Sequence, residues 1–325
     1  MGVSPVALRF PYGRVVLPRT RLAYIHLRNL LSDAKRDRAG RITGYVAVSL
    51  LDELVVFYLL RGEVATATVR SPAGAQPIPI ASAVDKIPHE PEYGEICFHE
   101  ADEEQLACMF ATHAFSPEPW PDSMVANDPA ALFPFLMSTT FDGMIEVVAN
   151  ENVNYLLFRN GAVARTFLTS GPHGTVVDRV AKLFSREGRV GELKVSRWGT
   201  PAPLSVQAPP ALVQAYRDLS TALVQRLVMQ GREDAPTVAE HARRNLLGAH
   251  PVLASFSLSG APTRDPITDS AVLTAGIAAW IREVLWTGLD HENSPPEALF
   301  RELTWDRRHI FQSAGLFDQM PWKVL

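Results

Sequence analysis

Hydrophobic and polar positions along the first part of the chain predict a small antiparallel sheet. Residues 45–50 alternate as a strand does, and 54–60 form a continuous apolar run typical of a strand buried on both faces. Residues 64–69 are rich in threonine and valine, which favour strands. Between the last two segments, Gly62 can adopt the positive φ of a tight turn. Together the three segments predict an antiparallel meander.

Helices and a fourth strand are predicted around this meander. Apolar residues predict one helix over 22–31 and another over 80–87, the second following a proline-rich loop. A glycine-led strand is expected over 94–98. Asp102 is suited to be the N-cap of a helix that ends near His113. The first module therefore spans 22–113.

The same order of elements is predicted a second time. Gly44-Tyr45-Val46-Ala47-Val48 corresponds to Gly143-Met144-Ile145-Glu146-Val147 at an offset of 99. A helix from Pro210 to about residue 230 is expected to complete this second copy. Repetition at a fixed period indicates tandem duplication. The prediction is an α+β fold with modules at 22–113 and 128–230.

Six glycines mark corresponding turns and strand starts in the two copies. They are Gly44, Gly62, Gly94, Gly143, Gly161 and Gly191. The pair Gly94 and Gly191 is offset by 97 residues. This offset aligns Lys194 with Cys97 and Ser196 with His99.

Residues 231–325 have no copy and are predicted to be mostly helical, with one strand over 252–258. Their strongest helix is expected over 269–286, where one stripe of apolar residues predicts a core-facing surface. Aromatic residues are concentrated towards the end of the chain and can anchor protein interfaces. Residues 312–325 are expected to be exposed, so Phe317 and Trp322 are the candidate partner-binding residues.

Composition narrows the classes of function. The net charge is −4, from 31 basic and 35 acidic residues, which gives no footprint for nucleic acid. Two cysteines do not form a disulfide framework, so a cytoplasmic location is expected. No segment is apolar enough over a sufficient length to predict a membrane span.

Candidate catalytic and metal-binding residues do not form a convincing pattern. Cys97, His99, Cys108 and His113 lie within seventeen residues, but Cys108 and His113 are five apart on the predicted helix and point in different directions. The loop around His173 lacks the pattern of a phosphate-binding loop. His250 and Ser257 lie near one another in sequence without a nucleophile-elbow motif. No catalytic residue, metal or cofactor is therefore predicted.

The order of helix, meander, helix, glycine-led strand and helix resembles the PATAN family. In the first copy the residues that carry the resemblance are 43–46, 57–65 and 93–98, and in the second they are 142–145, 156–164 and 191–193. PATAN domains have no known function and occur in bacterial signalling proteins, often beside receiver domains. The resemblance implies an interaction module and carries over no catalytic residue.

Two functional hypotheses follow. The first is a non-enzymatic adaptor that binds another protein in bacterial signalling or motility control, with a homodimer also compatible. The alternative is a small-molecule sensor with a pocket between the two modules. An enzyme is the least favoured class.

Overall fold

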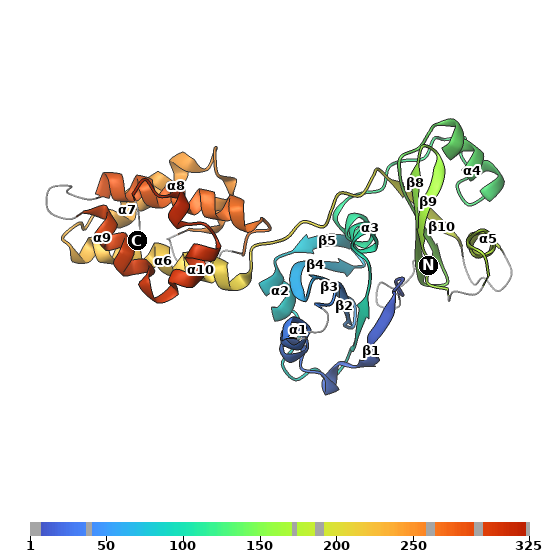
Figure 1. Ribbon diagram of the computed structural model, residues 1–325, viewed down its shortest axis with the longest axis horizontal. Helices are drawn as coiled ribbons and strands as arrows, with labels where there is room; N and C mark the ends of the chain where they lie inside the picture. Colours follow the sequence, from blue (N-terminus) through green and yellow to red (C-terminus); the bar gives the residue numbers. More distant parts are fainter. Residues whose placement is uncertain are drawn as a thin grey trace. The chain divides into compact units, whose positions relative to one another are not determined.

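The computed structural model describes residues 8–36, 41–170, 174–185, 192–257, 264–288 and 295–322. The chain divides into two compact units. The first comprises Met1–Ile78 with Ala83–Ser205, and the second comprises Pro79–Ser82 with Val206–Leu325. The first unit contains two sheets with flanking helices and the second is helical, which confirms the predicted α+β class (Figure 1).

The first module contains a six-stranded antiparallel sheet in the order β1-β6-β2-β3-β4-β5. Its strands are β1 (Arg14–Arg21), β2 (Gly44–Ser49), β3 (Leu54–Leu60), β4 (Glu63–Ser71), β5 (Gly74–Ile78) and β6 (Glu95–Glu100). The predicted meander is present as β2, β3 and β4. Sequence analysis did not predict β1 or β5. It assigned β5 to a loop because of Pro77, which an edge strand can accommodate.

The second module contains a four-stranded sheet in the order β10-β7-β8-β9. Its strands are β7 (Gly143–Ala149), β8 (Asn152–Arg159), β9 (Ala162–Phe167) and β10 (Lys194–Trp198). This order matches β6-β2-β3-β4 of the first sheet. Both central hairpins have the same register at an offset of 99, and each carries a bulge at the same place, at Tyr58/Leu59 and at Leu157/Phe158. The two copies therefore share one backbone plan.

The last strand of the second copy corrects the sequence alignment. Tyr45 pairs with His99 in the first sheet, and its counterpart Met144 pairs with Trp198 in the second. The offset is thus 99 here too, so Trp198 is the counterpart of His99 and Ser196 that of Cys97. The predicted offset of 97 was wrong because it was based on similar residues that precede the strand. The register of β6 and β10 is instead fixed by their pairing with β2 and β7. Gly191 lies outside the described residues.

Close packing accounts for the first glycine of each copy. A Cβ atom on Gly44 would lie 2.1 Å from the carbonyl oxygen of His99, and one on Gly143 would lie 2.4 Å from that of Trp198. Both residues begin strands rather than turns. Any larger side chain would push the first strand of the meander away from its neighbour.

The second glycine of each copy lies in a hairpin turn. Arg61 and Gly62 have φ of 51° and 81°, and Asn160 and Gly161 have φ of 50° and 75°. Two successive positive φ values are typical of a type I′ turn, which matches the twist of the flanking strands. Gly94 also has a positive φ, of 106°, at the start of β6.

A side chain next to each leading glycine fixes this turn. The amide of Arg61 donates to Thr43 Oγ1 at 3.1 Å, and the amide of Asn160 donates to Asp142 Oδ1 at 2.6 Å. The repeated spacing of glycines therefore reflects a hairpin whose tip is bonded back to the start of its first strand.

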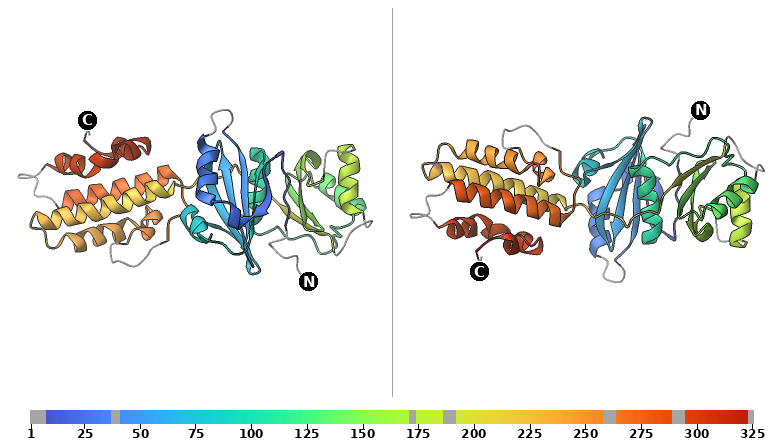
Figure 2. Two further views of the ribbon diagram at one scale, coloured as in Figure 1. Left: turned by 90° about the horizontal axis from the view of Figure 1, so that it is seen from below. Right: turned by 90° about the horizontal axis from the view of Figure 1, so that it is seen from above.

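The first unit is built in layers, with one helix between the two sheets (Figure 2). On the outer face of the first sheet lies α1 (Leu27–Arg36), and Ala83 of α2 (Ile80–Asp85) joins the same core. Between the sheets lies α3 (Glu103–Ala114), whose Leu106, Cys108, Met109 and Ala111 contact a core shared by both modules. The outer face of the second sheet packs on α4 (Pro129–Ser138) and α5 (Val176–Phe184).

Corresponding faces of the two sheets meet at α3. Tyr45, Val56 and Tyr58 of the first sheet share this core with Met144 and Tyr155 of the second. Met144 and Tyr155 are the counterparts of Tyr45 and Val56 at the offset of 99. The modules thus present the same face to one another, as the subunits of an isologous dimer do.

The segment before β1 also ties the modules together. Arg9 pairs with the start of β8, donating to Glu151 O at 2.9 Å and accepting from the amide of Val153 at 2.8 Å. The Tyr45 hydroxyl donates to Pro11 O at 3.1 Å. Residues 8–21 therefore belong to this unit, although the predicted module began at residue 22.

The second unit packs its helices around one apolar core. Its helices are α6 (Pro210–Met229), α7 (Ala235–Leu246), α8 (Ser270–Gly288), α9 (Pro296–Thr304) and α10 (Arg308–Ser313). The predicted core stripe of α8 is buried, and Trp280 Nε1 donates to Ala239 O at 2.9 Å. Pro251–Ser255 forms a 3₁₀ turn where a strand was predicted. No helix in the described ranges is long and apolar enough to cross a bilayer.

The boundary predicted at residue 230 differs from this division. The buried face of α6, from Leu212 to Leu227, belongs to the core that α7 and α8 share. Sequence analysis assigned α6 to the second module because α3 ends the first. Instead, α3 is bordered by both sheets and α6 begins the helical unit.

Candidate functional site

Phe317 and Trp322 pack against the helical core. Both are partly buried, and their ring centroids lie 6.0 Å and 6.2 Å from that of Phe300. Leu316 and Met320, from the same segment, are buried. Residues 312–322 therefore contribute to the core of the helical unit and do not display these two aromatic rings as free anchors.

The four candidate metal ligands are distributed between two environments. Cys97 and His99 lie on β6, and Cys108 and His113 are buried on α3. Within the described ranges, no three His, Cys, Asp or Glu side chains are placed to share a metal ion. Burial raises the pKa of Cys97 to about 11 and that of Cys108 to about 12, so both thiols are protonated at neutral pH.

The other candidate residues form no site with these. His173 lies outside the described residues, and His250 and Ser257 flank the Pro251–Ser255 turn.

A buried polar cluster lies in the shared core. His113 Nδ1 is 3.1 Å from the Tyr58 hydroxyl and 2.9 Å from the Thr68 hydroxyl. Burial, together with a smaller contribution from the charge of Arg70, lowers the pKa of His113 to about 3. The imidazole is therefore neutral and serves as a hydrogen-bonding core residue.

Glu146 and Tyr155 contribute to this core from the second sheet. Glu146 Oε1 and the Tyr155 hydroxyl are buried, and Thr112 is the neutral polar side chain that interacts with both residues. Burial raises the pKa of Glu146, and the nearby charges of Arg70 and Lys194 offset only part of this shift. The first sheet has Ala47 at the position of Glu146, so the sequence repeat could have identified this buried acid as a departure from it.

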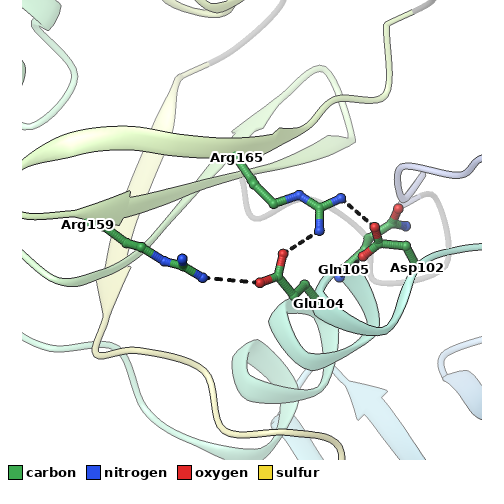
Figure 3. A network of polar contacts seen from close by, with 5 residues as sticks. All are labelled: Asp102, Glu104, Gln105, Arg159 and Arg165. Atoms are coloured by element: carbon green, nitrogen blue, oxygen red, sulfur yellow. Dashed lines mark hydrogen bonds and ion pairs between the residues drawn. The ribbon is translucent and has the colours of Figure 1, made fainter.

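An exposed ion-pair network joins α3 to the second sheet (Figure 3). Arg165 of β9 contacts Asp102 and Glu104, each at 2.5 Å, and Arg159 of β8 contacts Glu104 at 3.4 Å. Asp102 is also the N-cap of α3 and accepts from the amide of Gln105 at 3.1 Å. The four charged groups of the network neutralise one another, so the network orients β9 without creating a site of net charge.

The edges of the two sheets differ in how they are protected. In the first sheet, β5 contains Pro77, while β1 contains Pro18 and is interrupted by two register shifts. Proline and bulges are devices that prevent further strands from adding to an edge. In the second sheet, β10 is bridged by Glu118, whose amide donates to Arg197 O at 2.8 Å.

Strand β9 has none of these devices. Among the described residues it pairs with β8 alone, and its first four residues, Ala162 to Arg165, are exposed. Its counterpart β4 is buried from Ala65 to Val69 and pairs with β5 over Ala67–Ser71. Among the described residues, the second module therefore presents an open strand edge at the position where the first does not.

A separate cleft of about 460 Å³ lies beside β2 and β6. Tyr12, Tyr45, Cys97 and His99 line it from the first module and the segment before it, and Asn152 and Thr169 line it from the second module. The His99 ring contacts those of Tyr12 and Tyr45, at centroid distances of 4.5 Å and 5.4 Å. The sequence pattern indicated Cys97 and His99 only as candidate metal ligands, because Tyr12 and Tyr45 are distant from them along the chain.

Comparison with known proteins gives no relative from which a function could be inferred for this chain. No protein-family model, curated protein or solved structure matches the chain.

Proposed function

We propose that this protein is a non-enzymatic adaptor and that the open edge of β9 binds an extended segment of a partner protein. The observation that carries the proposal is the contrast between β9 and β4. A strand edge offers main-chain donors and acceptors to an incoming strand, and this is a common way to bind peptides.

The chemistry of β9 fits this role. Ala162, Val163 and Ala164 offer small or moderate apolar side chains at the edge, and the Val163 side chain is 39% exposed. The charge of Arg165 is balanced by Asp102 and Glu104. A partner segment is therefore recognised through main-chain bonds and apolar contacts and needs no strong charge of its own.

The resemblance to PATAN domains supports a cytoplasmic partner from bacterial signalling or motility control. A second copy of this chain is the competing occupant, because two β9 strands could pair with each other.

Site-specific photocrosslinking in the native cell tests the proposal. The photoreactive residue p-benzoylphenylalanine replaces Ala162 on β9 or, as a control, Gln76 on the proline-containing edge strand β5. Both positions are exposed. We expect an adduct with one defined protein from position 162, with mass spectrometry locating the bond in an extended segment, and none from position 76.

Two results would count against the proposal. Equal adducts from both positions, or none from 162, would remove the special role of β9. An adduct joining two copies of this chain would assign the edge to a homodimer instead.

A further inference from the structure

The cleft beside β2 and β6 has the properties of a ligand site that is distinct from the β9 edge. Its volume of about 460 Å³ lies within the range of about 300–1,000 Å³ that small-molecule pockets occupy. The lining is mostly apolar, and it comes from the segment before β1, from β2 and β6, and from the second module.

One buried atom in this cleft lacks a partner. His99 Nδ1 is buried and forms no hydrogen bond to any described residue. A buried polar atom without a partner typically costs about 1–3 kcal/mol. A polar group of a bound molecule would remove this cost, and a neutral imidazole nitrogen can either donate or accept.

The surrounding rings favour a flat molecule. Tyr45 stacks on His99 with an angle of 19° between the rings, and the tilted ring of Tyr12 lies 4.5 Å from that of His99 at an angle of 46°. Tyr45 is held by its bond to Pro11 O, whereas Tyr12 is 47% exposed. Tyr12 can therefore move to admit a ring, which would stack on these aromatic groups.

The charges beside the cleft are balanced. Arg19 and Glu95 both line it and pair with each other at 2.5 Å. Burial lowers the pKa of His99, which keeps the imidazole neutral at neutral pH. Arg9 borders the cleft, but its side chain is exposed and its charge stays in water.

We propose that this cleft binds an uncharged, planar heteroaromatic molecule whose ring nitrogen hydrogen-bonds to His99 Nδ1. Because Asn152 and Thr169 also border the cleft, such a molecule would contact both modules at once. The inference is independent of the proposed adaptor function, which depends on β9.

Cys97 provides a direct readout of occupancy. The chain has two cysteines, so Cys108→Ala leaves Cys97 as the single thiol. Its rate of modification by methyl methanethiosulfonate at pH 8.5 is measured with increasing indole or quinoline. The indole ring nitrogen only donates and that of quinoline only accepts, so the tighter probe identifies the role of Nδ1.

We expect saturating probe to slow Cys97 modification at least tenfold. His99→Phe, which keeps an aromatic ring but removes both nitrogens, should weaken the tighter probe about tenfold. Tyr24→Ala, at an exposed tyrosine that does not line the cleft, is the matched control and should leave the affinity unchanged. Thermal unfolding of each variant verifies that it folds.

Three results would overturn the inference. They are no protection of Cys97 by either probe, equal affinity in the His99→Phe variant, and tighter binding of indole-3-carboxylate than of indole. None of them would affect crosslinking at position 162, so the two proposals can fail separately.

Discussion

Strands β4 and β9 occupy corresponding positions in two sheets that share strand order, register and bulge, yet one is buried and the other is exposed. In the first module, β4 extends to Ser71 and pairs with β5 over Ala67–Ser71. In the second, β9 ends at Phe167 and pairs with no further strand among the described residues. The comparison separates what the two modules share, which is the hairpin and its glycines, from what differs between them, which is whether the strand edge is covered.

The inner faces of the two modules diverged as well. Glu146 stands where the first module has Ala47, and Trp198 stands where it has His99. The first difference places an acid in the shared core, and the second leaves the second module without a counterpart of the His99 imidazole that lines the cleft. Functional differences between the copies are therefore expected at the edge and at this inner face.

The largest expected effect on stability is at the glycine that begins the meander in each module. Gly44→Ala and Gly143→Ala each place a Cβ atom within 2.4 Å of a backbone oxygen, and backbone must move to relieve the contact. Each should lower the free energy of unfolding by about 3 kcal/mol. Gly248→Ala, where the added atom has no neighbour within 4 Å, should change it little. Urea denaturation measures the free energy of unfolding of all three variants. A strong effect in only one module would contradict the structural equivalence of the two modules.

The next effect concerns the buried acid. Because the pKa of Glu146 is raised on folding, the native chain binds more protons than the unfolded chain above pH 4.5. The contribution of Glu146 to stability is therefore present below pH 4.5 and is lost as the pH rises through the folded pKa. Glu146→Gln cannot titrate, so its stability relative to the parent chain should rise between pH 5 and pH 8.

This gain should grow steadily as the pH rises through the folded pKa of Glu146, because the parent chain loses the contribution and the variant does not. Urea denaturation at several pH values measures this gain in stability. Because His113 is present in both chains, its own titration cancels in the comparison. A constant difference across this range would show that Glu146 titrates normally.

A smaller effect is expected at the hairpin turns. Asp142→Ala removes a charged acceptor at 2.6 Å, whereas Thr43→Ala removes a neutral one at 3.1 Å. We expect losses of about 1 kcal/mol and about 0.5 kcal/mol, because a charged group strengthens a hydrogen bond. Thermal unfolding would argue against this account of the turns if neither variant differed from the parent chain.

The smallest effect is expected at the exposed ion-pair network. Arg165→Gln removes both contacts with α3, but the groups are exposed and such pairs contribute less than about 1 kcal/mol. The difference from the parent chain should shrink further in 1 M salt. A loss of several kcal/mol would instead show that this network holds the modules together.

Sequence reasoning succeeded where a local pattern determined local structure. The apolar run of β3 and the turn at Gly62 define the meander without reference to the rest of the chain. It failed where distant contacts decide the outcome. No residue of strand β1 is buried, so the strand depends on pairing with β6, and α6 belongs to the helical unit because of its partners. Phe317 and Trp322 lie on a segment with little helical pattern, so their contact with Phe300 left no local signal.

Hydrogen exchange of the free protein, followed by mass spectrometry, tests the contrast between the two edges most directly. Because β4 is buried and paired on both sides over part of its length, its peptide should exchange at least tenfold more slowly than that of β9. Equal protection of the two strands would contradict the account, because it would mean that β9 is covered in solution and has no open edge to offer.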